Sequence, residues 1–166
     1  LDLGTSLKYK TSVAELMKNR LVVTGMLTLV STIFTVIISM PLGYIAGKKN
    51  GSLADMGVRG FSMIGLAMPS FWIGILLLIV FGVKLKIFPV SGWGSDWPTH
   101  VRSLVLPGVT QAIGTSAILI RNLRNNVIEV KNSDYVYFAR SKGLKEGRIA
   151  ARHIIRNASI PTVTLL

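Results

Sequence analysis

The side chains best suited to contact a polar solute are hydroxyl and amide groups set within the most apolar parts of the chain. From residue 24 to residue 47, small and hydroxyl residues recur every three or four positions, which places them in one stripe along a helix. The members of this stripe are Thr24, Thr28, Ser31, Thr32, Thr35, Ser39, Gly43 and Gly47. Small residues let membrane helices approach closely, and the same stripe could line a solute path. Both interpretations stay open, and the candidates for a path are Thr28, Thr35, Ser39, Gln111 and Thr115.

Residues suited to covalent or metal chemistry are scarce. The sequence has no cysteine, and its two histidines, His100 and His153, lie far apart, so we expect no metal site. No carboxylate lies within the apolar segments, which argues against a carrier that relays protons through buried acids. A phosphate-binding loop of the form G-x-x-x-x-G-K-[ST] is absent, and the nearest run, from Gly43 to Lys49, has the wrong spacing. The sequence therefore predicts neither an enzyme nor a bound cofactor.

Long apolar segments must position these groups. Hydrophobic residues make up 50% of the chain, and the mean hydropathy is +0.53. About 20 residues of helix cross the hydrocarbon core of a membrane. We expect spans at 22–46, 61–82 and 104–120, with a further span starting at 158. The predicted fold class is all-α: a polytopic transmembrane helical bundle, of which this chain is a part.

The segments around the spans have their own signals. Residues 1–20 are expected to form an external linker with a short amphipathic helix, since Ser12 and Glu15 have the spacing of a capping box. Residues 21–166 are expected to form one transmembrane domain, incomplete in this chain. Pro69, in the middle of the second span, predicts a kink or a break.

The distribution of charge predicts the orientation. Of 19 lysines and arginines, nine lie between Arg121 and Arg156, so the loop 121–157 is expected in the cytoplasm. No aromatic stacking platform accompanies this charge, which argues against nucleic-acid binding. The loop 48–60 would then be internal, and residues 1–20 and 83–103 external. An external start requires a span upstream, and we expect the native protein to continue beyond both ends.

A short helix is predicted within the basic loop. Ser133 is a suitable N-cap, Asp134 complements the helix dipole, and Gly143 suits the position just after the helix. Tyr135, Phe138 and Ala139 fall at i, i+3 and i+4, and such a set usually anchors a helix in a groove of a partner.

This loop resembles the "EAA" loop of ABC-importer permeases, in the dipeptide, oligopeptide and nickel branch. The loop residues that carry the resemblance are Asp134-Tyr135-Val136, Ala139 to Leu144, Arg152-His153, Arg156-Asn157-Ala158 and Pro161. Three further stretches agree with the same branch: Asp2 to Ser6, Met68 to Phe71, and Phe88 to Trp93. The general Glu-Ala-Ala is replaced here by Tyr137-Phe138-Ala139, which leaves the substrate open.

The resemblance implies the type I ABC-importer permease fold, with this chain holding the second to fourth spans and the start of the fifth. The helix from Ser133 to Lys142 would be a coupling helix in a cleft of the ATPase subunit, with Phe138 and Ala139 buried in that contact. Arg140 and Lys142 could pair with acids of the ATPase or be ordinary cytoplasmic charge. The residues expected to couple the chain to the ATPase are Asp134, Tyr135, Phe138, Ala139, Arg140, Lys142 and Gly143.

The resemblance also implies partners. These are ABC ATPase subunits that bind the ATP, a second and related permease subunit, an extracytoplasmic solute-binding protein and the lipid bilayer, without nucleic acid. The expected function is to form part of a path for di- and oligopeptides across the cell membrane of a prokaryote. Two alternatives remain: the same machinery for nickel or another small solute, and a membrane scaffold whose basic loop binds anionic lipid.

Overall fold

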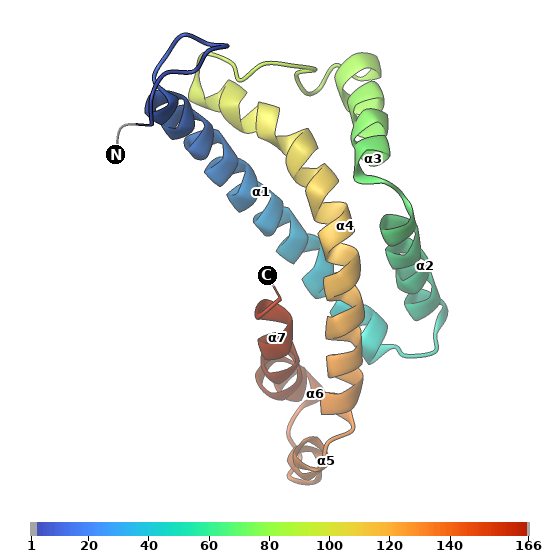
Figure 1. Cartoon of the computed structure of the whole chain (residues 1–166). Helices are drawn as coiled ribbons and strands as arrows, with labels where there is room; N and C mark the ends of the chain where they lie inside the picture. Colours follow the sequence, from blue (N-terminus) through green and yellow to red (C-terminus); the bar gives the residue numbers. More distant parts are fainter. Residues whose placement is uncertain (1–2, 166) are drawn as a thin grey trace.

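The computed structural model describes residues 3–165, so Leu1, Asp2 and Leu166 lie outside the described part, and with them one residue of the stretch from Asp2 to Ser6. Within residues 3–165 all regular elements are helices, and the predicted all-α class is confirmed (Figure 1). The elements are α1 (Val13–Lys48), α2 (Leu53–Ala67), α3 (Ser70–Leu77), the π-helical η1 (Leu78–Lys84), α4 (Trp97–Lys131), α5 (Asp134–Ser141), α6 (Glu146–Ile149), the π-helical η2 (Ala150–Ile155) and α7 (Arg156–Val163).

Two long helices, α1 and α4, form the axis of the molecule and cross side by side (Figure 1). Both are long and apolar enough to cross a membrane. Their close approach depends on glycine: Gly43 lies against Leu123, and Gly47 lies against Val127 and the backbone of Arg124. A side chain at either glycine would separate the helices, so this half of the small-residue stripe serves helix packing.

The second predicted span is broken, as Pro69 indicated. Helix α2 ends at Ala67, Met68 is extended, and α3 begins after Pro69. The two halves, with η1 continuing α3 to Lys84, meet at 105°. Proline has no N–H to donate and disfavours the helical conformation of the residue before it. A straight helix is therefore excluded at this point.

Several predicted boundaries differ from the structure. The short helix expected within residues 1–20 is the first part of α1, which runs from Val13 without interruption into the apolar segment. Ser12 is its N-cap residue but makes no side-chain capping bond, so the predicted capping box does not form. Helix α4 runs from Trp97 to Lys131, beyond the expected 104–120, and residues 121–131 are helix where a loop was expected. The helix-period signal at 121–131 was hidden by the basic charge of this segment.

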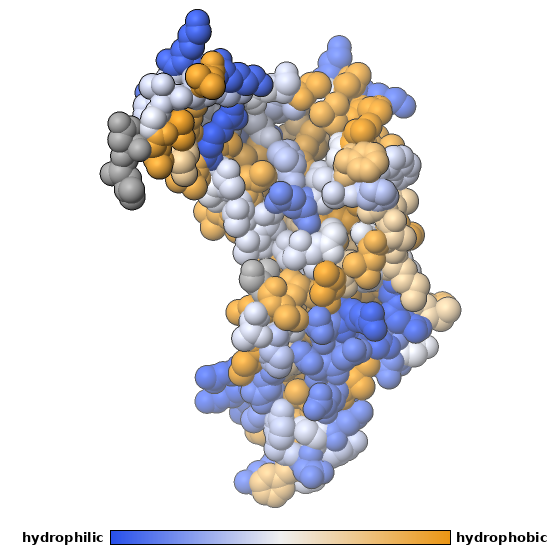
Figure 2. All heavy atoms as spheres, viewed as in Figure 1, coloured by the Kyte–Doolittle hydropathy of each residue, from blue (hydrophilic) through white to orange (hydrophobic). Residues whose placement is uncertain are grey.

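The basic loops gather at one end of the molecule. The turn after α1 and the elements α5–α7 lie toward the same end of α4, whereas the residues before α1 and the loop before α4 lie toward the other (Figure 1). Hydrophilic residues crowd the end that holds α5–α7 (Figure 2). Beneath them a core packs α5–α7 onto α4, and it is formed by Leu123, Val127, Val136, Ala139, Ile149, Ile154 and Ala158. This arrangement agrees with the sidedness expected from the charge.

Candidate functional site

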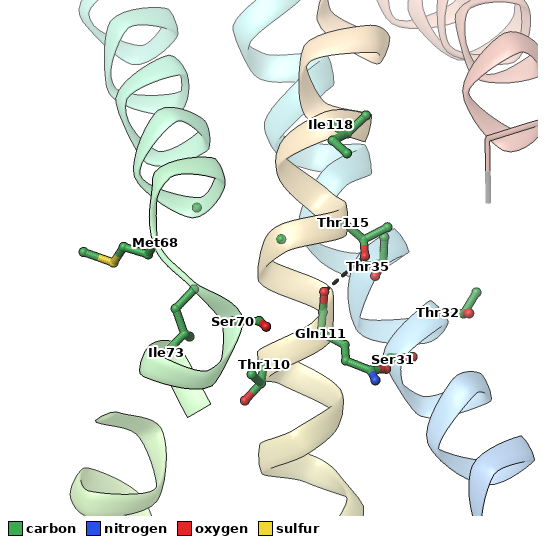
Figure 3. Close-up of a pocket in the computed structure, with 12 residues that line it drawn as sticks. Ser31, Thr32, Thr35, Met68, Ser70, Ile73, Thr110, Gln111, Thr115 and Ile118 are labelled. Atoms are coloured by element: carbon green, nitrogen blue, oxygen red, sulfur yellow. Dashed lines mark hydrogen bonds between the residues drawn. The ribbon is translucent and has the colours of Figure 1, made fainter. Parts of the chain in front are cut away.

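A cavity of about 520 Å³ lies where the broken helix faces α1 and α4 (Figure 3). Gln111 and Thr115 of α4 lie between residues of α1 and residues at the break between α2 and α3. No charged residue of the described chain lines it. The lining consists of Ser31, Thr32, Thr35, Gly65, Met68, Ser70, Ile73, Thr110, Gln111, Gly114, Thr115 and Ile118. Most of these side chains can hydrogen-bond, although the cavity sits among apolar segments.

The structure divides the predicted path residues. Thr35, Gln111 and Thr115 line the cavity together. Ser39 is buried in the packing of the helices, and Thr28 is exposed and donates to the carbonyl of Thr24. The small-residue stripe of α1 is thus divided: Ser31, Thr32 and Thr35 line the cavity, whereas Ser39, Gly43 and Gly47 lie in the helix packing.

Some lining residues were not among the predicted path residues. Ser70 and Thr110 line this cavity and also a second one of about 610 Å³, between α3, residues 89–92 and α4. The two cavities share Ser70, Thr110 and Gln111, so Gln111 lies at their junction. The position of Ser70 directly after Pro69 was an available signal, since irregular backbone at membrane depth is tolerated where it lines a cavity or is buried in protein.

Helix α5, the predicted coupling helix, is present, and it has one buried face and one exposed face. Val136 and Ala139 are 0% and 6% exposed and pack in the core with Leu123 and Val127. Phe138 is 61% exposed, and its neighbour Tyr137 is exposed as well. The expectation that Ala139 and Phe138 share one contact with a partner is corrected here, because Ala139 points into this chain's own core. The i, i+3, i+4 spacing places these residues on neighbouring positions of one helix. It does not show which of them the rest of the chain covers.

The polar residues of α5 have partners within the chain. The hydroxyl of Tyr135 accepts a 3.0 Å hydrogen bond from Asn157 Nδ2. Arg140 Nε donates to Glu146 Oε1 at 2.8 Å, and this hydrogen bond is the main cause that lowers the pKa of Glu146 below its ordinary value. Lys142 Nζ lies 4.5 Å above the ring of Phe138. Arg140 therefore pairs with an acid of its own chain, and the exposed aromatic residues of α5 are Tyr135, Tyr137 and Phe138.

Gly143 ends α5 as the sequence predicted. Its φ is +76°, in the left-handed region that favours glycine. The N–H of Gly143 bonds the carbonyl of Arg140, and the N–H of Leu144 bonds the carbonyl of Ala139. These two bonds form a Schellman motif, which satisfies the last carbonyls of the helix and reverses the chain.

Replacing Gly143 with alanine is expected to destabilise the protein by about 1–2 kcal/mol, because a side chain disfavours the left-handed conformation. A methyl group here would meet no atom within 4 Å, so the loss comes from the backbone alone. Thermal unfolding of the purified protein in detergent measures it. Gly147→Ala in α6 is the control, since that site is equally open and has no positive φ, and should be neutral or slightly stabilising. Equal losses in both variants would contradict this account of Gly143.

A buried ion pair that the sequence analysis did not anticipate joins α2 to α4. Asp55, in the first turn of α2, is 0% exposed. Arg124 Nε lies 2.6 Å from Asp55 Oδ1, and Arg124 Nη2 lies 2.8 Å from Oδ2. The N–H of Gly51 also donates to Oδ2, and Arg124 further donates to Asn50 Oδ1. The sequence showed Asp55 as the one acid of a basic loop, but its partner is 69 residues away.

Comparison with known proteins supports a transport role. Residues 39–166 match the family described as "Binding-protein-dependent transport system inner membrane component". The chain is similar to the oligopeptide transport system permease protein AppB of Bacillus subtilis, with 40% identity over 99% of this chain and 54% of that protein. It is also similar to the dipeptide transport system permease proteins DppB of Lactococcus lactis (34% identity, 99% of this chain, 53% of the relative) and of Escherichia coli (30%, 99% and 56%). The chain spans about half the length of these curated relatives.

Proposed function

Because this chain belongs to the family of binding-protein-dependent transport system inner-membrane components, we propose that it is part of the permease subunit of an ATP-driven importer of di- and oligopeptides. The names of its relatives support peptides as the cargo, since they are oligopeptide and dipeptide permeases. The observation that carries the proposal is α5, a short helix fixed by its inner face to the end of a long apolar helix while its aromatic face is free.

The role of α5 is to receive force from an ATPase subunit. Val136 and Ala139 fix the helix to Leu123 and Val127 of α4, and Phe138 projects from the opposite side. A push on the exposed face therefore moves α4, because packed side chains transmit displacement with little compression. Helix α4 also carries Gln111 and Thr115, so the same movement reaches the cavity. ATP is bound and hydrolysed by the ATPase, and this chain needs no cofactor of its own.

The partners follow from this role. They are ABC ATPase subunits, a second permease subunit related to this one, and an extracytoplasmic solute-binding protein, in the cell membrane of a prokaryote.

Nickel is the less favoured cargo, because the cavity presents hydroxyl and amide groups in place of the imidazole ligands that suit this metal. A membrane scaffold would have no use for an uncharged polar cavity between its spans.

The test is a crosslink between α5 and the ATPase. In a full-length permease otherwise free of cysteine, Phe138→Cys labelled with a maleimide that carries a photoreactive group is expected to crosslink to the co-expressed ATPase on illumination, and the yield should change with ATP. Val136→Cys is the matched control, because this neighbour is 0% exposed and should not react. Labelling of the Phe138→Cys variant by an impermeant reagent from outside the cell would overturn the orientation. If the introduced thiol is cytoplasmic and never crosslinks to an ATPase, the importer proposal is wrong.

A further inference from the structure

Three hydroxyl groups that line the cavity donate their protons to the helix backbone, so their oxygen atoms are left to accept hydrogen bonds from a ligand. Thr110 Oγ1 donates to the carbonyl of Leu106 at 2.7 Å, Thr115 Oγ1 donates to the carbonyl of Gln111 at 3.1 Å, and Ser31 Oγ donates to the carbonyl of Thr28 at 3.0 Å. Each proton is thus directed to the helix backbone, and the remaining lone pairs can accept a hydrogen bond. These three side chains make the wall rich in acceptors.

Four polar side chains that line the cavity make no side-chain hydrogen bond within the described part of the chain: Thr32, Thr35, Ser70 and Gln111. Thr35 is 2% exposed, lines the cavity and keeps a free hydroxyl. The side-chain amide of Gln111 extends toward Ser31, across the opening between α4 and α1 (Figure 3). An amide offers two N–H donors and a carbonyl acceptor. No buried side-chain nitrogen or oxygen of the described residues lacks a partner, so the unpaired Thr35 hydroxyl is open to the cavity, where a ligand or water can complete its bonding.

The broken helix adds backbone hydrogen-bond donors and acceptors to the cavity. Because Pro69 has no N–H, the carbonyl of Gly65 lacks the donor that a continuous helix would supply. The N–H groups of Ser70 and Phe71 open α3 and have no intrahelical acceptor. Gly65 and Ser70 both line the cavity. Donors and acceptors therefore occur together around a space that no charged side chain of the described residues lines.

We propose that this cavity binds the main-chain amides of the transported peptide, with Gln111 and Thr35 as the recognising side chains. A peptide bond is uncharged and carries one N–H and one C=O, which matches the mixed and uncharged lining. The inference rests on the proposed peptide importer and deepens it: the membrane path selects for the peptide backbone, and the side-chain charge of the cargo has little influence there. Gln111, at the junction of the two cavities, contacts each peptide bond as it passes.

Reconstituted full-length importer, with its ATPase, second permease and binding protein in liposomes, tests the proposal. The substrates are trialanine and trialanine with one peptide nitrogen methylated, and the readout is the ratio of their uptake efficiencies. The binding protein is the same in every sample, so a change in this ratio among permease variants reports on the permease. Gln111→Leu and Thr35→Val are expected to raise the KM for trialanine by about three- to tenfold, the value of one neutral hydrogen bond. Gln111→Leu should also reduce the discrimination against the methylated peptide.

Thr24→Val is the matched control, since it removes a hydroxyl from the same stripe of α1 away from the cavity, and it should leave both values unchanged. Peptides with a central lysine or glutamate should respond to Gln111→Leu as trialanine does. If the wild-type importer moves peptides and the ratio stays constant in both cavity variants, the cavity proposal is wrong and the proposed function stands. If the wild-type importer moves no peptide while its ATPase is active, the proposed function itself is wrong.

Discussion

Replacing Arg124 with leucine is expected to lower the free energy of unfolding by about 3–5 kcal/mol, because removal of one partner leaves a buried charge uncompensated. Asp55 is 0% exposed, and its carboxylate would retain only the N–H of Gly51 and a more distant second arginine. Unfolding of the purified full-length protein in detergent, followed by heat or by denaturant, measures the loss.

The second arginine provides an internal control on the same carboxylate. Arg59 Nε lies 3.7 Å from Asp55 Oδ1, and its side chain is half exposed. Arg59→Leu is therefore expected to cost about 0–1 kcal/mol, the usual value of an exposed ion pair. Arg124→Lys should be intermediate, since lysine keeps the charge but cannot form the paired hydrogen bonds of a guanidinium. Similar losses for the leucine variants of Arg59 and Arg124 would show that Arg124 is not the dominant partner.

A double variant separates the ion pair from the packing around it. When Asp55 and Arg124 are both replaced by leucine, no charge of this pair is left buried, and part of the stability lost in Arg124→Leu should return. The pair joins the first turn of α2 to the C-terminal part of α4. The pair therefore ties together two helices, α2 and α4, that each contribute residues to the cavity lining.

Replacing Gly47 with alanine is expected to cost about 1–3 kcal/mol, because the added methyl group overpacks the contact between α1 and α4. The new Cβ would lie 2.6 Å from Val127 Cβ and 2.8 Å from the carbonyl oxygen of Arg124. The second contact is with backbone, so a change of rotamer cannot relieve it. The helices must move apart, and thermal unfolding in detergent should show a lower transition temperature.

Gly25→Ala in the same helix is the control. An alanine there would meet no atom within 4 Å outside the local helix. Alanine is favoured over glycine in a helix by about 1 kcal/mol, so this variant should be neutral or slightly more stable. If Gly47→Ala were also neutral, the close approach of α1 and α4 at this level would not exist in solution.

The sequence alone determined the features that depend on neighbouring residues. Apolar segments of spanning length predicted the membrane helices, and the missing N–H of Pro69 predicted the break between α2 and α3. Ser133 and Gly143 marked the two ends of α5 correctly. The predicted ends of the spans were less accurate, because α1 and α4 both continue as helices beyond their apolar segments. Residues 121–131 of α4 pack through Leu123 and Val127, whereas residues 13–21 of α1 are mostly exposed.

Only the tertiary structure decided which face of each helix meets which neighbour. It divided the stripe of α1 into a part that packs on α4 and a part that lines the cavity with Thr35. It turned Ala139 inward and left Phe138 outside, and it brought Arg124 onto Asp55 from 69 residues away. The physical reason is common to all three: spacing along one helix fixes which residues share a face, whereas burial and pairing depend on helices that are distant in the sequence.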